Sequence, residues 1–175
     1  MIPIRPPSNF KNSLVKLVVF VLLILNSFSL LAQESPPQPI SVFVNTDQEL
    51  SFGAFYPINS GGSITVSATG ARTTSGDVIP INQGFTYSPA LFEVQALPGT
   101  IIHVQVGSAG ILTGSNGGTM NLITNDSNPG SPFISNAVPP ARTDVRIGGT
   151  LTVGSIQTNK AGNYVGTFTV TFDQE

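Results

Sequence analysis

The chain has 175 residues with seven basic and nine acidic side chains, many glycines and prolines, and no cysteine. The lack of cysteine excludes disulfides and a lipid-modified cysteine, so stability must come from the hydrophobic core. The low, slightly acidic charge gives no electrostatic reason to bind nucleic acid or anionic lipid.

Residues 1–32 have the order of a secretory signal peptide. Arg5, Lys11 and Lys16 form a basic region, residues 17–25 are an unbroken apolar run, and Ala32 precedes a more polar sequence. This order is typical of a signal that is cleaved after export. An uncleaved membrane anchor is the alternative, although nine apolar residues fall short of the ~20 that span a bilayer.

Cleavage after Ala32 leaves 143 residues, which suits a single domain. The signal takes three of the seven basic residues, so the mature chain has four basic and nine acidic residues and a net charge of −5. We expect the mature protein in the periplasm or at the cell surface. Its contact with the membrane is expected only through the signal peptide before cleavage.

The mature chain begins with a proline-rich lead at 33–39, followed by a folded domain predicted at 40–175. Ile40, Val42 and Val44 alternate with their neighbours and predict a first strand. A second strand is predicted at 50–55, where Gly53 suggests a bulge.

Short strands and turns follow one another through the middle of the chain. We predict strands at 63–68, 71–74 and 78–81, with turns at Thr69-Gly70 and Ser75-Gly76, and Pro80 indicates an edge position. Segments 91–96 and 100–106 flank Leu97-Pro98-Gly99, which predicts a hairpin.

The next region contains the longest irregular stretch, at 125–140, and loops of that length are usually functional or mobile. Strands are predicted before it at 111–113 and 119–124. After it, strands at 143–147 and 151–153 flank Gly148-Gly149, where we expect the chain to bend.

The clearest strand pattern is the last one. One face carries Tyr164, Gly166, Phe168, Val170 and Phe172, and the other carries Val165, Thr167, Thr169 and Thr171. We predict one nine-residue strand in a central or near-central position, closing the core with Phe168, Val170 and Phe172. Tyr164 follows the turn at Gly162, which is typical of a tyrosine corner whose hydroxyl bonds nearby backbone.

These elements predict an all-β fold. No segment has the apolar spacing of a long helix, and about nine or ten short strands are separated by Gly, Pro and Asn turns. The pattern favours an antiparallel immunoglobulin-like, Greek-key β-sandwich.

A family resemblance adds to this interpretation. Leu50-Ser51-Phe52-Gly53, Gly-Gly-x-Ile-Thr-Val at 61–66, Gly118-Thr119-Met120, Gly-Thr-Leu-Thr-Val at 149–153 and Gly-Asn-Tyr-Val-Gly-Thr-Phe-Thr-Val at 162–170 occur in that order. The chain resembles a family of small exported bacterial domains of uncharacterised function. It is more distantly similar to spore-coat-protein-U domains, which include subunits of archaic chaperone–usher pili. The resemblance implies an immunoglobulin-like sandwich and a surface or pilus-related role. Pilus relatives commonly carry a disulfide, which this chain cannot form.

Two candidate polar sites are better explained as structural residues than as catalytic or metal-binding ones. His103 is the single histidine and lies mid-strand, and no GxSxG, SxxK or HExxH spacing accompanies it, so a solvent-facing strand histidine is favoured. Asn125, Asp126 and Asn128 offer oxygen ligands for calcium, but one local carboxylate favours an Asx turn.

Two further groups of residues suggest partners. Arg142, Asp144 and Arg146 point outward while Thr143, Val145 and Ile147 point inward, which could grip an acidic partner but favours a solvated, edge-protecting face. Tyr56, Tyr87 and Phe133 lie near loops and could stack on sugars, although amphipathic rim positions are favoured.

The sequence therefore indicates no catalytic residue, metal site or cofactor. Our first hypothesis is a non-enzymatic structural or adhesive surface domain whose partners are surface or pilus subunits or glycans. A glycan- or peptide-binding module using the 125–140 loop is the alternative. A pilin would give an extra strand to a neighbour. Residues 33–39 hold three prolines and cannot serve, and 40–46 is more simply the domain's own first strand, so we expect a self-complete monomer.

Overall fold

The computed structural model describes residues 16, 38–107 and 109–175. The predicted signal peptide, apart from Lys16, and most of the proline-rich lead therefore lie outside the described residues. The folded unit is Gln38–Glu175. Among the described residues, no helix is both long enough and apolar enough to cross a membrane.

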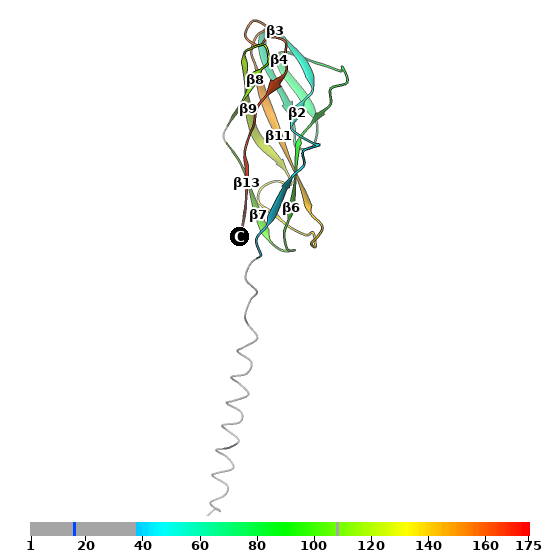
Figure 1. The fold of residues 1–175 in the computed structure, drawn as a ribbon, viewed down its shortest axis with the longest axis vertical. Helices are drawn as coiled ribbons and strands as arrows, with labels where there is room; N and C mark the ends of the chain where they lie inside the picture. Colours follow the sequence, from blue (N-terminus) through cyan, green and yellow to red (C-terminus); the bar gives the residue numbers. More distant parts are fainter. Residues whose placement is uncertain (1–15, 17–37, 108) are drawn as a thin grey trace, which may run out of the picture. The chain divides into compact units, whose positions relative to one another are not determined.

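The folded unit is built from thirteen strands that pair only in antiparallel fashion, which confirms the predicted all-β class (Figure 1). The strands are β1 (Ser41–Val44), β2 (Ser51–Phe52), β3 (Ala54–Val66), β4 (Arg72–Ile81), β5 (Tyr87–Ser88), β6 (Ala90–Gln95), β7 (Ile101–Val106), β8 (Gly110–Gly114), β9 (Thr119–Asn128), β10 (Phe133–Ile134), β11 (Thr143–Val153), β12 (Tyr164–Val165) and β13 (Val170–Gln174). The count exceeds the predicted nine or ten because several strands are only two residues long.

The strands form one large and two small sheets. The large sheet has the order β1-β6-β11-β9-β8-β12, and β3 pairs both with β11 and with β4. The second sheet has the order β10-β7-β13, and β2 pairs with β5. Side chains of the large and second sheets share the core, as expected for a sandwich.

The terminal segment keeps the predicted alternation but not the predicted place in the fold. Tyr164, Phe168, Val170 and Phe172 are half-buried, while the residues between them are exposed. The prediction of one nine-residue central strand is wrong. Residues 166–169 are not strand, β12 ends the large sheet, and β13 ends the second sheet. The segment is thus an edge strand of two sheets in succession.

The reason for this switch lies in the segment's partner. β7 belongs to the second sheet and β8 to the large sheet, so the chain itself changes sheets between them. The terminal segment runs antiparallel to both, pairing first with β8 and then with β7. Between the two ladders, the Gly107 N–H donates to the Thr169 carbonyl at 2.8 Å. A strand pattern reports which face is buried, whereas the partner depends on distant residues.

The hairpin predicted around Leu97-Pro98-Gly99 is also wrong in its pairing. Both flanking strands form, as β6 and β7, and Thr100 N–H donates to the Leu97 carbonyl across the turn. However, β6 pairs with β1 and β11, while β7 pairs with β10 and β13. The turn therefore links the two layers, because both edges of β6 are already occupied.

Long strands replace several predicted short ones. β3 runs through Gly61-Gly62, and β4 runs through Ser75-Gly76 where a turn was expected. Their register shifts between Pro57 and Gly62, so that the pair is bulged there instead of broken. The turn at Thr69-Gly70 joins the two strands as predicted, and β4 pairs with β3 alone, which confirms the edge position inferred from Pro80.

The stretch at 125–140 is less irregular than predicted. β9 extends to Asn128, and β10 occupies Phe133–Ile134. β11 is continuous across Gly148-Gly149, with a register shift there that matches the expected bend. Because β11 has neighbours on both sides, Arg146 does not protect an edge, contrary to prediction, and Arg142 precedes the strand.

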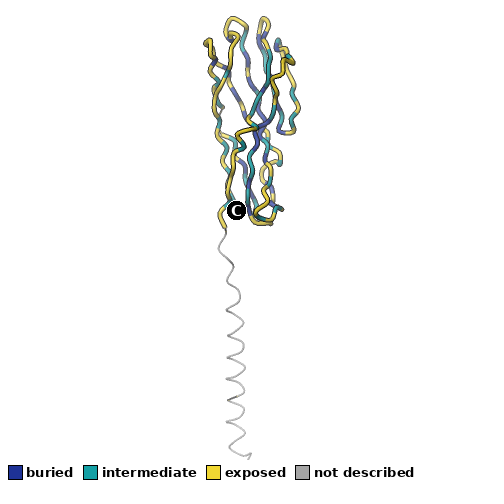
Figure 2. Tube along the Cα trace, turned by 45° about the vertical axis from the view of Figure 1, so that its right-hand side comes forward, coloured by how far each residue is buried: buried dark blue, intermediate teal, exposed yellow. Residues whose placement is uncertain are grey.

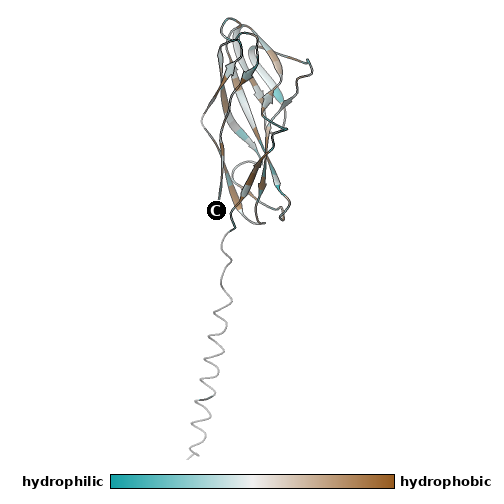
Figure 3. Cartoon of the chain, viewed as in Figure 1, coloured by the Kyte–Doolittle hydropathy of each residue, from teal (hydrophilic) through white to brown (hydrophobic). Residues whose placement is uncertain are grey.

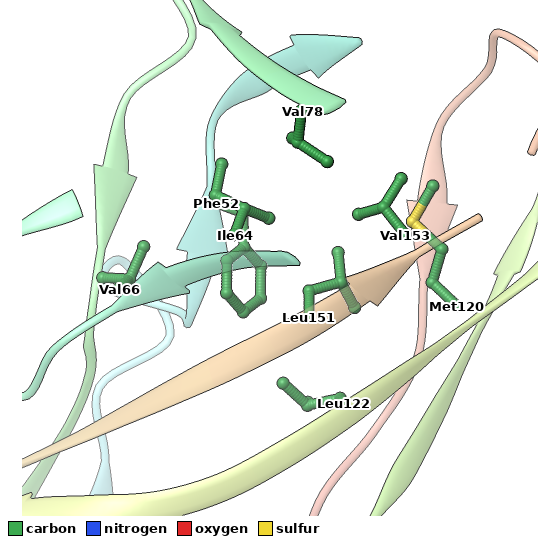
Figure 4. Packing of buried hydrophobic residues seen from close by; sticks show 8 residues of the cluster. All are labelled: Phe52, Ile64, Val66, Val78, Met120, Leu122, Leu151 and Val153. Carbon is green, nitrogen blue, oxygen red and sulfur yellow. The ribbon is translucent and has the colours of Figure 1, made fainter. Parts of the chain in front are cut away.

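The core consists of two apolar clusters. The first contains Phe52, Ile64, Val66, Val78, Met120, Leu122, Leu151 and Val153 (Figure 4). The second contains Ala90, Val94, Ala96, Ile102, Val104, Phe133, Val145 and Ile147. Leu50 and Phe168 pack against both clusters. Buried and exposed positions alternate along the strands, as the sandwich requires (Figure 2).

Candidate functional site

Among the described residues, the surface has an open trough of about 920 Å³. Two stretches that are far apart in the sequence line it, residues 44–57 (without 47) and residues 159–168. Its base includes the core residues Leu112, Met120, Leu122 and Leu151. The trough therefore reaches the first core cluster.

The lining of the trough combines apolar, aromatic and amide groups. Phe55 and Phe168 are half-buried, while Tyr56 and Phe85 are 44% and 64% exposed. Carboxamides contribute as well, among them Gln48, Gln83 and Asn163. Glu49 and Lys160 add one charge of each sign. The lining therefore has no net charge and suits a ligand that has an apolar face and hydrogen-bonding groups.

Tyr164 lines the trough and is held in place at both its ring and its hydroxyl. Its ring packs against the first cluster, and its hydroxyl lies 2.9 Å from the Lys160 carbonyl and 3.2 Å from the Gly117 carbonyl. The contact to Lys160, four residues upstream, is the one expected of a tyrosine corner. Gly162 lies in the bend between them, and a Cβ there would be 2.7 Å from the Ser115 hydroxyl oxygen.

Asn159 holds the start of the same stretch, and sequence reasoning missed it. Its side chain is buried, donates to the Thr119 carbonyl at 2.9 Å and accepts a hydrogen bond from the Gly154 N–H. An asparagine in a polar turn usually faces solvent, so only the fold identifies this one as structural.

The remaining predicted site residues are carried by the terminal segment. The Phe92 ring packs edge-on against Phe168, with 6.5 Å between the ring centroids, and its centroid is 5.6 Å from that of Phe172. Val170 packs against the second cluster beside them. These side chains join the terminal segment to β6, so it is part of the hydrophobic interior.

Residues 42–173 match the family described as "Domain of unknown function (DUF4402)". The chain belongs to this family. The matched range contains the trough and runs from β1 to β13, so both the first and the last strand are parts of the family's domain. Neither a curated protein nor a solved structure matches the chain.

The three aromatic candidates of this DUF4402 domain have separate environments. Tyr56 lines the trough. Tyr87 is exposed, and the Arg72 guanidinium lies 4.4 Å from its ring centroid. Phe133 is buried in the second cluster and cannot stack on a ligand. Phe85, which no motif indicated, takes its place among the exposed rings.

The polar candidates form ordinary structural contacts. His103 Nε2 lies 3.2 Å from a Glu175 carboxylate oxygen at the end of the second sheet. Asp126 lies within β9 and accepts a hydrogen bond from the Ala68 N–H at 2.7 Å, so the predicted Asx turn is wrong. In the described part of the chain, no three His, Cys, Asp or Glu side chains cluster as metal ligands would.

Arg142, just before β11, and Arg146, within it, contact side chains of the large sheet. Arg142 lies 3.0 Å from a Glu93 carboxylate oxygen, and its guanidinium is 3.6 Å from the Phe43 ring centroid. Arg146 lies 3.0 Å from an Asp144 carboxylate oxygen. Val145 and Ile147 are fully buried, which confirms the predicted inward face. Ion pairs on this exposed face add little stability, but they hold the guanidinium groups in place.

Proposed function

We propose that the protein is a non-enzymatic, exported structural or adhesive surface domain that holds an extended segment of a partner in its trough. The observation that carries the proposal is the trough itself, an opening lined by apolar core residues together with exposed rings and amides. A segment with alternating apolar residues could cover this base while its backbone bonds the polar lining.

The export half of the proposal rests on the sequence of residues 1–32. Expression in a bacterial host, followed by fractionation and amino-terminal mass spectrometry, tests it. We expect a periplasmic or surface protein that begins at Gln33. Recovery of the full chain in the membrane fraction would favour the uncleaved anchor instead.

A pilus-related version of this role is supported by the resemblance to spore-coat-protein-U domains. It requires one subunit to give a strand to the next. β1 pairs with β6 of its own domain, so a self-complete unit is the simpler version. If the mature protein forms polymers, and deletion of residues 33–46 abolishes them, the pilin version is favoured.

Glycan binding is the second candidate, and a specific observation favours it. Tyr56 and Phe85 place exposed rings beside carboxamide groups in the trough, and rings with amides are suited to sugars. The predicted use of the 125–140 loop is replaced in this version by the trough, because Phe133 is buried.

Exposed residues allow a matched test of the trough. Phe85 lines it and is 64% exposed, while Ile111 does not line it and is 61% exposed. Phe85→Ser and Ile111→Ser should therefore differ in binding but not in folding. The measurement is a titration by two-dimensional NMR with a blocked peptide of alternating Thr and Val, and with neutral hexasaccharides.

We expect the peptide to shift signals from residues 48–57 and 159–168. Phe85→Ser, but not Ile111→Ser, should weaken the affinity for the peptide about tenfold or more. Shifts with a hexasaccharide alone would favour the glycan candidate. Shifts with neither probe, or equal losses in both variants, would contradict a binding role for the trough.

A further inference from the structure

The free edges of the sheets differ in how they are protected. β4 carries Asp77, Pro80 and a bulge, β13 carries Asp173, and β10 and β12 are only two residues long. Charges, prolines, bulges and short length are the usual devices that stop a sheet edge from pairing with another chain. Among the strands at the ends of the sheets in the described part of the chain, β1 is the one of three or more residues that has none of these devices.

β1 is also strongly apolar for an exposed strand (Figure 3). Val42, Phe43 and Val44 are 38%, 37% and 65% exposed. Val42 pairs with the fully buried Val94, so its side chain lies on the core side of the sheet, and Val44 lies on that side too. Nothing in the described chain covers these two core-side valines fully.

The hydrogen bonds of β1 show which backbone groups are free. The Asn45 N–H donates to the Leu91 carbonyl at 3.0 Å, in register with the β1–β6 ladder. Because bonded and outward-facing residues alternate along a strand, the N–H and C=O groups of Val42 and Val44 point away from β6. The Ile40 N–H is already bonded to the Gln174 side chain at 3.0 Å, which limits the free edge to the residues after it.

We propose that two copies of the chain associate by antiparallel pairing of their β1 strands. One register satisfies both constraints: Val42 of each copy pairs with Val44 of the other, and Phe43 faces its own counterpart across a twofold axis. This register joins the free N–H and C=O groups in four hydrogen bonds and keeps core-side valines on one face. Residues 40–46 hold no charge, so the paired strand residues themselves bring no like charges together.

Neighbouring side chains already position Phe43 for this contact. Its ring lies under the Arg142 guanidinium at 3.6 Å, and Arg142 is held in turn by Glu93 at 3.0 Å. The two Phe43 side chains would face each other as a non-hydrogen-bonded pair on the outer face of the joined sheet. An interface of this size falls below the ~1,000 Å² of stable complexes, so the dimer is reversible.

The pairing can be captured with one engineered cysteine, because the chain has none of its own. Cα atoms of a non-hydrogen-bonded antiparallel pair lie about 4.5 Å apart, which a disulfide can bridge. Protein purified after export and carrying Phe43→Cys should form a disulfide dimer under mild oxidation, read on non-reducing gels. The control is Val165→Cys, on the edge strand β12, where the native side chain is 73% exposed.

We expect Phe43→Cys to cross-link at least tenfold faster than Val165→Cys. Adding Val44→Lys to the Phe43→Cys protein should bring its rate down to that of Val165→Cys. Circular dichroism checks that each variant is folded, and sedimentation velocity of the native chain should show a concentration-dependent dimer that the Val44→Lys chain lacks. Equal rates for the two cysteines, or a Phe43→Cys rate unchanged by Val44→Lys, would overturn the proposal.

This inference does not rest on the proposed function. Within β1, Val44 lines the trough, whereas Phe43 lies on the face of the sheet away from the core and does not line it. Phe85→Ser should therefore leave the Phe43→Cys cross-linking rate unchanged. If the domain cross-links but binds neither NMR probe, the dimer proposal stands and the proposed function of the trough is rejected.

Discussion

Tyr164 shows what a single polar contact does in this fold. Its ring belongs to the core, while its hydroxyl reaches the Lys160 carbonyl at 2.9 Å. The turn around Gly162 is thereby tied to the first residue of β12. A hydroxyl that links a turn to a strand stabilises the turn against local opening.

Tyr164→Phe should lower the free energy of unfolding by about 1 kcal/mol, which is the net contribution of one such hydrogen bond. The measurement is urea denaturation at neutral pH. Tyr56→Phe serves as the control, because this tyrosine is exposed on the trough and the loss of its hydroxyl should change stability little. A Tyr164→Phe curve that overlays the native one would show that the tie does not stabilise the fold.

At the same scale, the sequence could indicate Tyr164 but not Asn159 or Phe85. A tyrosine after a glycine turn carries a local signal. The role of Asn159 depends on Thr119 and Gly154 meeting it in space, and the exposure of Phe85 depends on how β4 and β5 are joined. Such roles arise from tertiary contacts, which no local pattern encodes.

Among the elements, the terminal segment is the most instructive. Its alternation predicted which side chains turn inward, and these are half-buried, but the predicted single strand is divided into β12 and β13. Its partners were not predictable, because they depend on where β7 and β8 cross between sheets. The hairpin at 97–99 fails for the same reason: a turn signal fixes a change of direction, not the sheet that receives the next strand.

The crossing depends on a close approach of two backbones at Gly166. A Cβ at this position would lie 2.5 Å from the Ile111 carbonyl oxygen. Gly166→Ala should therefore force the two strands apart and cost roughly 1–3 kcal/mol of unfolding free energy. Thermal and urea unfolding measure the effect.

Gly130→Ala is the matched control for Gly166→Ala, because a Cβ at Gly130 would meet no atom within 4 Å. It should be close to neutral. If both alanine variants were equally stable, the close approach at Gly166 would not limit the crossing.

For the whole molecule, the two core clusters are joined by few residues. Leu50 and Phe168 touch both, and the terminal strand β13 supplies Val170 and Phe172 to the second cluster. With no disulfide available, these contacts must hold the layers together. The sandwich class was predictable from strand spacing and composition, whereas the division of its core was not.

Removal of residues 170–175 tests how much the second sheet depends on β13. β7 would lose one of its two partners, and the second cluster would lose two half-buried apolar side chains. We expect the free energy of unfolding to fall by roughly 3–5 kcal/mol. Urea denaturation measures it, and removal of Glu175 alone is the control. Equal stability of the two truncated chains would show that β13 is dispensable.

The bond between the Ile40 N–H and the Gln174 side chain has a mechanical consequence. It brings the first and last strands together at one end of the domain, near the point marked C in Figure 1. Tension applied through these two neighbouring points would pull β1 from β6 and β13 from β7 one rung at a time. Such peeling breaks the hydrogen bonds one at a time. The domain would therefore unfold at a lower force when it is pulled by its two ends than when it is pulled across its sides.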